Sequence, residues 1–68
     1  MSFEKRLSEV IKTSGKMQVV IAREANVSKQ CISDYKAGKS TPSIDTLRLL
    51  CKSLDVSSDY LLELTDEY

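Results

Sequence analysis

The chain has 68 residues and no net charge, and 41% of its residues are hydrophobic, which argues against disorder. A chain of this length folds as one domain with one modest core, because only about 60% of its unfolded surface can be buried. It has no apolar run of the roughly 20 residues that a membrane helix needs, and no signal peptide is recognisable after Met1, so we expect a cytoplasmic protein.

Two helices are predicted in the first part of the chain. The first begins at Phe3 and ends at Gly15, which lacks a side chain and suits a left-handed helix cap. Its apolar residues recur at helical spacing on one face: Phe3, Leu7, Val10 and Ile11. The second spans roughly residues 18–25 and is closed by Asn26, because asparagine tolerates positive φ. Its inward positions are Ile21, Ala22 and Ala25.

A third helix has the clearest start signals in the chain. Ser28 is a good N-cap, and Val27 lies at the spacing of a hydrophobic staple from Ile32. Ile32 and Tyr35 then point inward. Gly38 ends the helix, because glycine readily adopts the left-handed conformation that closes one.

The last two helices are predicted from repeated start signals. A turn precedes the fourth helix, because Pro42 keeps the residue before it out of the helical region. Ser43 caps this helix, whose apolar stripe is Ile44, Leu47, Leu50, Cys51 and Leu54. For the fifth helix, Ser57 is the N-cap and Val56 lies at staple spacing from Leu61.

The end of the chain completes this organisation. Leu61, Leu62 and Leu64 are expected to pack back on the helices, and residues 65–68 are expected to fray. We therefore predict an all-α fold, a five-helix bundle with one domain over residues 1–64 and a frayed tail over residues 65–68.

Neither the cysteines nor the other polar residues indicate a cofactor or an active site. Cys31 and Cys51 are not a close pair, and a chain without histidine lacks the ligands for a zinc site. We expect two reduced thiols, although one disulfide is possible on counting alone. The sequence shows no nucleophile–base pair and no glycine-rich phosphate loop, so we expect no metal, no cofactor, no small-molecule substrate and no enzyme activity.

The charges are distributed unevenly along the chain. Residues 1–40 contain eight basic and four acidic side chains, whereas residues 41–68 contain two basic and six acidic ones. The basic half is suited to face an anion, and the acidic end is most simply a solubilising surface.

Residues 17–36 are the segment most specific for a function. Ala22 is small enough to let two helices approach closely, and the turn at residues 25–27 is short, so the helices must cross steeply. With Ile32 and Tyr35 inside, a polar face is left near the start of the third helix: Lys29, Gln30, Ser33 and Asp34. Such a face beside a helix N-terminus is suited to reading the major groove of DNA.

At these positions the sequence resembles the phage-repressor and Cro-type helix-turn-helix family, also called XRE-like, over about residues 3–64. The matching features are Gln18, Ala22, Val27-Ser28, Ile32-Ser33, Gly38-Lys39, Pro42-Ser43, Thr46-Leu47, Val56-Ser57 and Asp59-Tyr60-Leu61-Leu62. The resemblance implies a lambda-repressor-like bundle in which the second and third helices form the DNA-reading unit.

The resemblance also implies a role for each matching side chain. The side chains expected at base edges are Lys29, Gln30, Ser33 and Asp34. Lysine can donate to guanine, glutamine can pair with adenine, and aspartate can accept from cytosine. The side chains expected at phosphates are Gln18, Lys36, Lys39, Ser40 and Thr41. Gln18 is also expected to brace Gln30.

Several positions depart from the family pattern. Met17 stands where a serine or threonine usually caps the second helix, so that helix is expected to lack its N-cap. Val19 and Val20 take positions that are often polar, and we expect them to be exposed. Asp34 places a negative charge on the reading face, which is costly unless it meets cytosine or pairs with a lysine.

We therefore expect a transcriptional regulator, a repressor, that binds double-stranded DNA sequence-specifically and does not associate with membranes. A homodimer joined near the fifth helix would cover Leu62 and Leu64 and place two recognition helices about 34 Å apart on a roughly palindromic operator. Two interpretations of Tyr60 stay open, an interface anchor or partial burial against the fourth helix. The alternative function is a protein-interaction module, such as an antitoxin or adaptor, which neutral charge and exposed Val19 and Val20 would suit.

Overall fold

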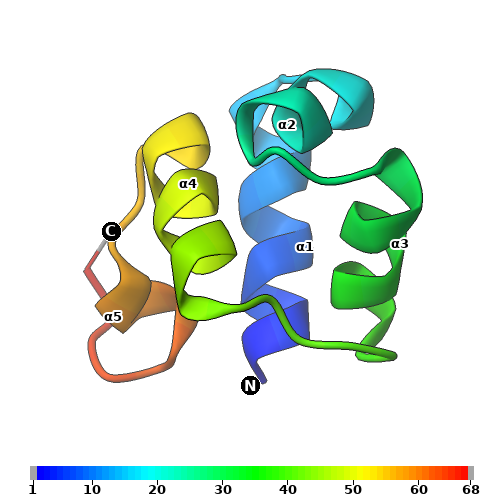
Figure 1. The fold of residues 1–68 in the computed structure, drawn as a ribbon. Coiled ribbons are helices and arrows are strands. Elements are labelled where there is room, and N and C mark those ends of the chain that lie inside the picture. The colour runs from blue at the N-terminus through cyan, green and yellow to red at the C-terminus, as the bar shows by residue number, and fades with distance from the viewer. Residues whose placement is uncertain (1, 68) are drawn as a thin grey trace.

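The computed structural model describes residues 2–67, which contain five α-helices and no β-strand. The helices are α1 (Phe3–Ser14), α2 (Gln18–Glu24), α3 (Lys29–Ala37), α4 (Ile44–Leu54) and α5 (Ser58–Leu61), as Figure 1 shows. The predicted all-α five-helix bundle is confirmed. Tyr68, the last residue of the tail that we expect to fray, lies outside the described residues.

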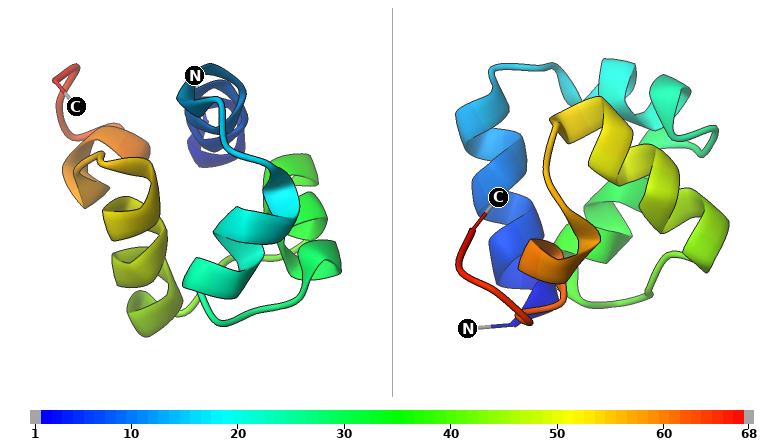
Figure 2. Two further views of the ribbon diagram at one scale, coloured as in Figure 1. Left: turned by 90° about the horizontal axis from the view of Figure 1, so that it is seen from above. Right: turned by 90° about the vertical axis from the view of Figure 1, so that its left-hand side faces the viewer.

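The first helix, α1, packs against α3, α4 and α5. In Figure 1, α3 and α4 lie on opposite sides of α1, and α2 crosses the top, where it packs against both α3 and α4. The view from above in Figure 2 shows that these helices enclose a common interior. None of the helices within residues 2–67 combines the length and the hydropathy that crossing a membrane requires.

One apolar core fills this interior. It consists of Leu7, Val10, Ile11, Ile21, Ala22, Ala25, Ile32, Tyr35, Leu50, Leu54, Val56 and Leu61. Every helix therefore contributes at least one buried side chain, and full burial of a leucine or isoleucine stabilises the fold by about 1.5–3 kcal/mol. The inward positions predicted for α1, α2 and α3 are confirmed, except that Phe3 is only partly buried.

Three leucine and isoleucine positions expected to be covered are exposed instead. The exposed fractions are 79% for Ile44, 47% for Leu62 and 73% for Leu64. Ile44 is the first residue of α4, and this end of the helix projects from the bundle (Figure 2). The two leucines follow the end of α5, where Glu63 adopts a left-handed conformation with φ 65° and turns the chain. The prediction that these three side chains pack inward is wrong.

The predicted serine caps are present at the starts of three helices. The Oγ of Ser28 accepts from the Cys31 amide at 3.1 Å, that of Ser43 from Thr46 at 3.2 Å, and that of Ser57 from Tyr60 at 3.1 Å. Each such cap stabilises its helix by roughly 1 kcal/mol. Met17 makes no such bond at the start of α2, as predicted.

Left-handed residues end the helices where the sequence predicts them. Gly15 closes α1 with φ 75°, Gly38 closes α3 with φ 77°, and Asn26 has φ 58° in the turn after α2. Asp55 closes α4 with φ 55°, which the sequence analysis did not anticipate. Aspartate is one of the few residues with a side chain that enter this region readily.

The C-terminal segment is held by Arg6 of α1, a charged residue that is only 9% exposed. Its Nη1 donates to the carbonyls of Tyr60 and Thr65, and its Nη2 donates to Asp66 at 2.9 Å. The guanidinium also lies over the Tyr60 ring, 4.4 Å from its centre, in a cation–π arrangement. These bonds connect residues 65 and 66 to α1, and Tyr60 is half-buried against the core.

Candidate nucleic-acid interface

The turn between α2 and α3 is built around small and left-handed residues. Ala22 and Ala25 are 3% and 1% exposed, so these two small side chains are buried in the core at the end of α2. After Ala25, the left-handed Asn26 reverses the chain, and the Val27 amide donates to the Ala22 carbonyl at 2.9 Å. The steep helix-turn-helix predicted from this segment is present, because α3 begins only a few residues later at Lys29.

One side of α3 is buried and the other is open to solvent. Ile32 is fully buried and Tyr35 is 8% exposed, and burial raises the pKa of the Tyr35 hydroxyl. Lys29 and Gln30 are exposed. The four predicted base-reading side chains are thus brought together on the accessible side of α3, with Ser33 and Asp34 partly covered.

Gln18 links the start of α2 to this face of α3. Its Nε2 donates to the Ser33 hydroxyl at 2.7 Å and to the Lys29 carbonyl at 3.3 Å. Its Oε1 accepts from the Lys36 ammonium at 3.2 Å. The expected brace between Gln18 and Gln30 is wrong, because Ser33 and Lys36 hold the Gln18 amide and Gln30 is engaged elsewhere.

Gln30 is engaged by Asp34, one helical turn further along α3. The Gln30 Nε2 donates to the Asp34 Oδ1 at 2.9 Å, the i,i+4 arrangement in which helix side chains meet. The negative charge of Asp34 is therefore met by an amide donor. It is not paired with a lysine in the described residues, which was one of the two partners expected for it.

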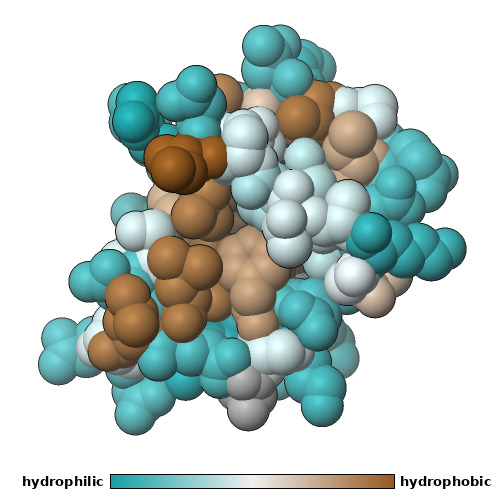
Figure 3. Space-filling view, turned by 60° about the horizontal axis from the view of Figure 1, so that its bottom comes forward, coloured by the Kyte–Doolittle hydropathy of each residue, from teal (hydrophilic) through white to brown (hydrophobic). Residues whose placement is uncertain are grey.

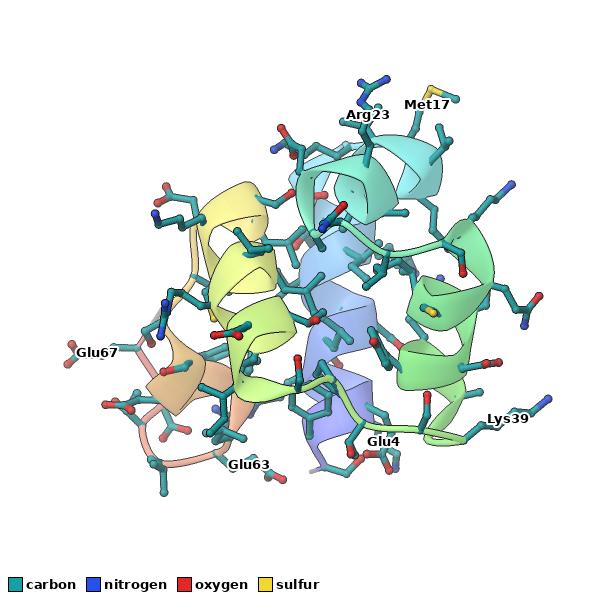
Figure 4. The ribbon with its side chains drawn as sticks, in the orientation of Figure 1. Glu4, Met17, Arg23, Lys39, Glu63 and Glu67 are labelled. Carbon is teal, nitrogen blue, oxygen red and sulfur yellow. The ribbon has the colours of Figure 1, made fainter. Side chains whose placement is uncertain are left out.

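The connection after α3 adds further polar groups beside this face. Lys39, Ser40 and Thr41 are all exposed and follow directly on the left-handed Gly38. In Figure 4, Lys39 points outward on the α3 side, whereas Glu63 and Glu67 lie at the opposite, α5 side of the molecule. These two acidic side chains of the C-terminal segment therefore lie apart from Lys39.

A second accessible surface is apolar and meets the connection after α3 at Thr41. A hollow in it is lined by Phe3, Thr41, Pro42, Leu47 and Leu62. Figure 3 shows apolar side chains gathered on this face of the molecule, and the exposed Ile44 and Leu64 extend the apolar surface of α4 and of the segment after α5. The sequence analysis pointed to Leu62 and Leu64 but missed the other lining residues, because they come from three separate segments.

The start of α2 carries a smaller exposed apolar group. Met17 is 69% exposed and Val19 is 49% exposed, while Val20 is half-buried. Figure 4 shows Met17 pointing away from the body of the protein, next to Arg23. The expected exposure is confirmed for Val19 and only partly for Val20.

Both cysteines carry free thiols, one on α3 and one on α4. Both are half-buried, and burial raises the pKa of the Cys51 thiol. Within residues 2–67, no group of histidine, cysteine, aspartate or glutamate side chains is arranged to hold a metal ion.

The steep α2–α3 pair and its open polar face define a helix-turn-helix protein. The sequence pattern of the helix-turn-helix family matches residues 6–61, and the chain belongs to this family. This assignment also confirms the prediction that the chain is not an enzyme.

Two regulators of Bacillus subtilis (strain 168) are similar in sequence. The chain is 37% identical to the HTH-type transcriptional regulator ImmR over 62 residues, which cover 91% of this chain and 49% of that protein. It is 32% identical to the uncharacterised HTH-type transcriptional regulator YobD over 62 residues, 91% of this chain and 55% of that one. The chain therefore spans about half the length of these relatives.

Solved structures with the same fold include two phage or bacterial repressors. The P22 c2 repressor, crystallised in complex with a synthetic operator, superposes with a TM-score of 0.87 at 27% identity, covering 93% of this chain and 96% of that one. The SOS-response repressor LexA from Eubacterium rectale gives a TM-score of 0.81 at 25% identity, covering 88% and 64%. These matches confirm the predicted lambda-repressor-like architecture.

Proposed function

We propose that the chain is a transcriptional regulator that binds double-stranded DNA sequence-specifically and acts as a repressor. The observation that carries this proposal is the open polar face at the start of α3, positioned by α2 in a chain of the helix-turn-helix family. The relatives support it, since two are named transcriptional regulators and the P22 c2 repressor was crystallised on an operator. A protein that acts on DNA in this way would work in the cytoplasm.

The proposed mechanism places the accessible side of α3 in the major groove. Lys29 would donate to guanine O6 and N7, Gln30 would pair with adenine N6 and N7, and Asp34 would accept from cytosine N4. Ser33, on the same face, is the remaining base-reading side chain. Contacts of this kind discriminate between bases by about 1–3 kcal/mol for a bidentate pair.

A second group of side chains would hold the sugar–phosphate backbone. It comprises Gln18, Lys36, Lys39, Ser40 and Thr41, which lie at the start of α2, the end of α3 and the connection that follows. The lysines would supply attraction that is independent of sequence and weakened by salt. Because these contacts carry no base information, they would set the register of α3 on the duplex.

We further propose that the regulator is a homodimer joined through the apolar surface around Leu62. A two-fold dimer presents the same surface from both copies, so one exposed apolar patch is sufficient to form the interface. In the dimer, Leu64 of each copy, which is 73% exposed, would be buried against the hollow beside Leu62 of the other copy. Two α3 helices about 34 Å apart would then require a roughly palindromic operator.

The dimer is tested by sedimentation equilibrium with two exposed apolar residues changed in the same way. Leu64→Asp should weaken self-association about tenfold or more, because it places a charge in the interface. Val19→Asp, at an exposed valine on α2, is the control and should leave self-association unchanged. A wild-type footprint that covers a single isolated half-site would contradict the dimer.

Selection of bound sequences from a random duplex pool tests DNA binding itself. The expected result is enrichment of one site with two related halves, together with an affinity that falls steeply as salt rises. A protein that enriches no sequence and shows no salt-dependent binding to random duplex would contradict the proposed function.

The exposed apolar group at the start of α2 favours one alternative, a protein-interaction module. Met17 and Val19 are accessible, and the chain carries no net charge. An antitoxin or adaptor using this bundle should not bind random duplex at low salt, whereas the regulator should bind it with a clear salt dependence. Direct titration with fluorescent duplex therefore separates the two functions.

A further inference from the structure

Two hydrogen-bonded pairs on the reading face determine which polar atoms remain for a ligand. The first involves Gln18, whose amide can be oriented in only one way. A lysine ammonium only donates and a backbone carbonyl only accepts. The Gln18 Oε1 must therefore face Lys36 and its Nε2 must face Ser33 and the Lys29 carbonyl, as the structure has them.

This orientation fixes the role of the Ser33 hydroxyl. Because the Gln18 Nε2 donates to it at 2.7 Å, the Ser33 Oγ is an acceptor in that bond and keeps its own proton for another partner. No hydrogen bond among residues 2–67 uses the Ser33 hydroxyl as a donor. Ser33 therefore presents an available donor on the accessible side of α3.

The second pair has the opposite polarity. The Asp34 carboxylate only accepts, so the Gln30 amide must turn its Nε2 toward Asp34, where the two atoms lie 2.9 Å apart. The Gln30 Oε1 and the second Asp34 oxygen are then left as acceptors, and the second Nε2 hydrogen of Gln30 is left as a donor. One turn of α3 thus combines a donor at position 33 with acceptors at positions 30 and 34.

We propose that this donor and acceptor pattern is a built-in specificity device, with Ser33 as a donor that selects an acceptor on a base edge and Gln18 as its positioning residue. The inference rests on the proposed function. Purine N7, guanine O6 and thymine O4 are acceptors in the major groove, whereas adenine N6 and cytosine N4 are donors. Ser33 would therefore reject cytosine at its position, and the Gln30–Asp34 pair would favour an amino group.

Competition binding to the selected operator tests the proposal, with all four bases placed at each position in turn. Ser33→Ala should reduce the preference against cytosine at one position of each half-site by roughly fivefold to tenfold, the scale of one lost hydrogen bond. Thr13→Ala, which removes an exposed hydroxyl at the end of α1, is the matched control and should change no base preference.

Gln18→Glu gives the sharpest arm, because a carboxylate accepts from Lys36 as before but cannot donate to Ser33. The Ser33 hydroxyl then donates its hydrogen bond to the new carboxylate at position 18, so only its lone pairs remain available to the base. The expected result is loss or reversal of the preference against cytosine at the same position. Repulsion between the new carboxylate and phosphates weakens all four duplexes alike and cancels in their ratios.

The outcomes separate the inference from the function on which it rests. A wild-type protein that selects no sequence overturns both. A wild-type protein that selects a site, with Ser33→Ala leaving every base ratio unchanged or Gln18→Glu shifting all bases equally, overturns the inference alone. Gln18→Ala removes the hydrogen bond to Ser33 without adding charge. It should therefore reduce the base preference at the same operator position even if Gln18→Glu fails to fold.

Discussion

The polar surface of α3 and the apolar surface beyond α5 are organised in opposite ways. On the reading face, Gln30 bonds to Asp34 within α3, and Gln18 of α2 bonds across to Ser33 and Lys36. Beyond α5, the exposed leucines are carried by a segment whose backbone is tied across the whole length of the chain by Arg6. The first surface is therefore set by hydrogen bonds within α3 and between α2 and α3. The segment that carries the second is tied by backbone bonds to α5 and by Arg6 to α1.

The difference suggests that the two surfaces have separate tasks and separate weaknesses. Hydrogen-bonding atoms in fixed directions distinguish ligands by chemistry, which suits base recognition. An apolar patch distinguishes little beyond shape, which suits self-association. Changes that remove local bonds on α3 should alter specificity, whereas a change at Arg6 should alter assembly.

The largest effect on stability is expected in the hydrophobic core, which lies beneath both surfaces. Ile32 is fully buried beneath the reading face and belongs to the single core that also holds Leu61. Ile32→Ala should lower the free energy of unfolding by about 2–5 kcal/mol, because it leaves a cavity. Urea unfolding monitored by circular dichroism measures this.

Ile44→Ala, at an isoleucine that is 79% exposed, is the matched control for that change. It should alter the free energy of unfolding by no more than about 0.5 kcal/mol. Equal losses for the two variants would show that the core does not support the surfaces as described.

The next largest effect is expected for the long-range contact. Arg6→Met keeps much of the apolar stem but removes the hydrogen bonds to Tyr60, Thr65 and Asp66. The free energy of unfolding should fall by about 2–3 kcal/mol, the scale of a hydrogen bond from a charged donor. Self-association, measured by sedimentation, should weaken at temperatures where the variant is still folded.

Arg48→Met is the control for the arginine change. The Arg48 side chain is 67% exposed and lies 4.0 Å from Asp45, so its loss should change stability by less than about 1 kcal/mol. If Arg6→Met leaves both stability and self-association at wild-type values, the proposed role of Arg6 in supporting the apolar surface is contradicted.

A smaller effect, confined to recognition, is expected on α3. Gln30→Ala should relax the base preference at one operator position by about 1–3 kcal/mol while leaving the unfolding curve unchanged. Lys39→Ala, outside the helix, should instead weaken all sequences alike and reduce the salt slope by roughly one unit. Both are measured by titration of labelled duplexes at several salt concentrations. A base preference untouched by Gln30→Ala would show that the reading face is assigned wrongly.

The same contrast explains how much could be predicted from sequence. Helix starts depend on residues a few positions apart, so Ser28, Ser43 and Ser57 were predicted with their caps, and the open side of α3 followed from Ile32 and Tyr35. Burial at the chain end depends on which distant segment covers it. The exposure of Leu64 therefore could not be read from spacing.

The candidate site shows the same division. The side chains on α3 were placed together correctly, because one helical face brings them together. Their hydrogen-bond partners were not predicted correctly. Gln18 has several acceptors within reach, and the sequence alone does not indicate which of them it contacts. Nothing in the pattern around Arg6 indicated that the Thr65 carbonyl, 59 residues away, is its partner.

The smallest expected effect concerns an exposed contact that joins the two halves of the molecule. Glu24 of α2 accepts from Lys16 at 2.8 Å and from Ser53 of α4 at 2.6 Å, and these hydrogen bonds lower the pKa of its carboxyl below 4.5. Folding favours the ionised carboxylate. Its contribution to the free energy of unfolding is therefore present above pH 4.5 and is lost as the pH falls through the lowered pKa. Near pH 7, where the carboxyl is ionised, the wild type should have a higher melting temperature than Glu24→Gln. This difference in melting temperature should disappear on acidification. Glu9→Gln, on the exposed side of α1, should show no gap at either pH. A gap for Glu24→Gln that persists below the lowered pKa would mean that side-chain packing, rather than the charge of Glu24, joins α2 to α4.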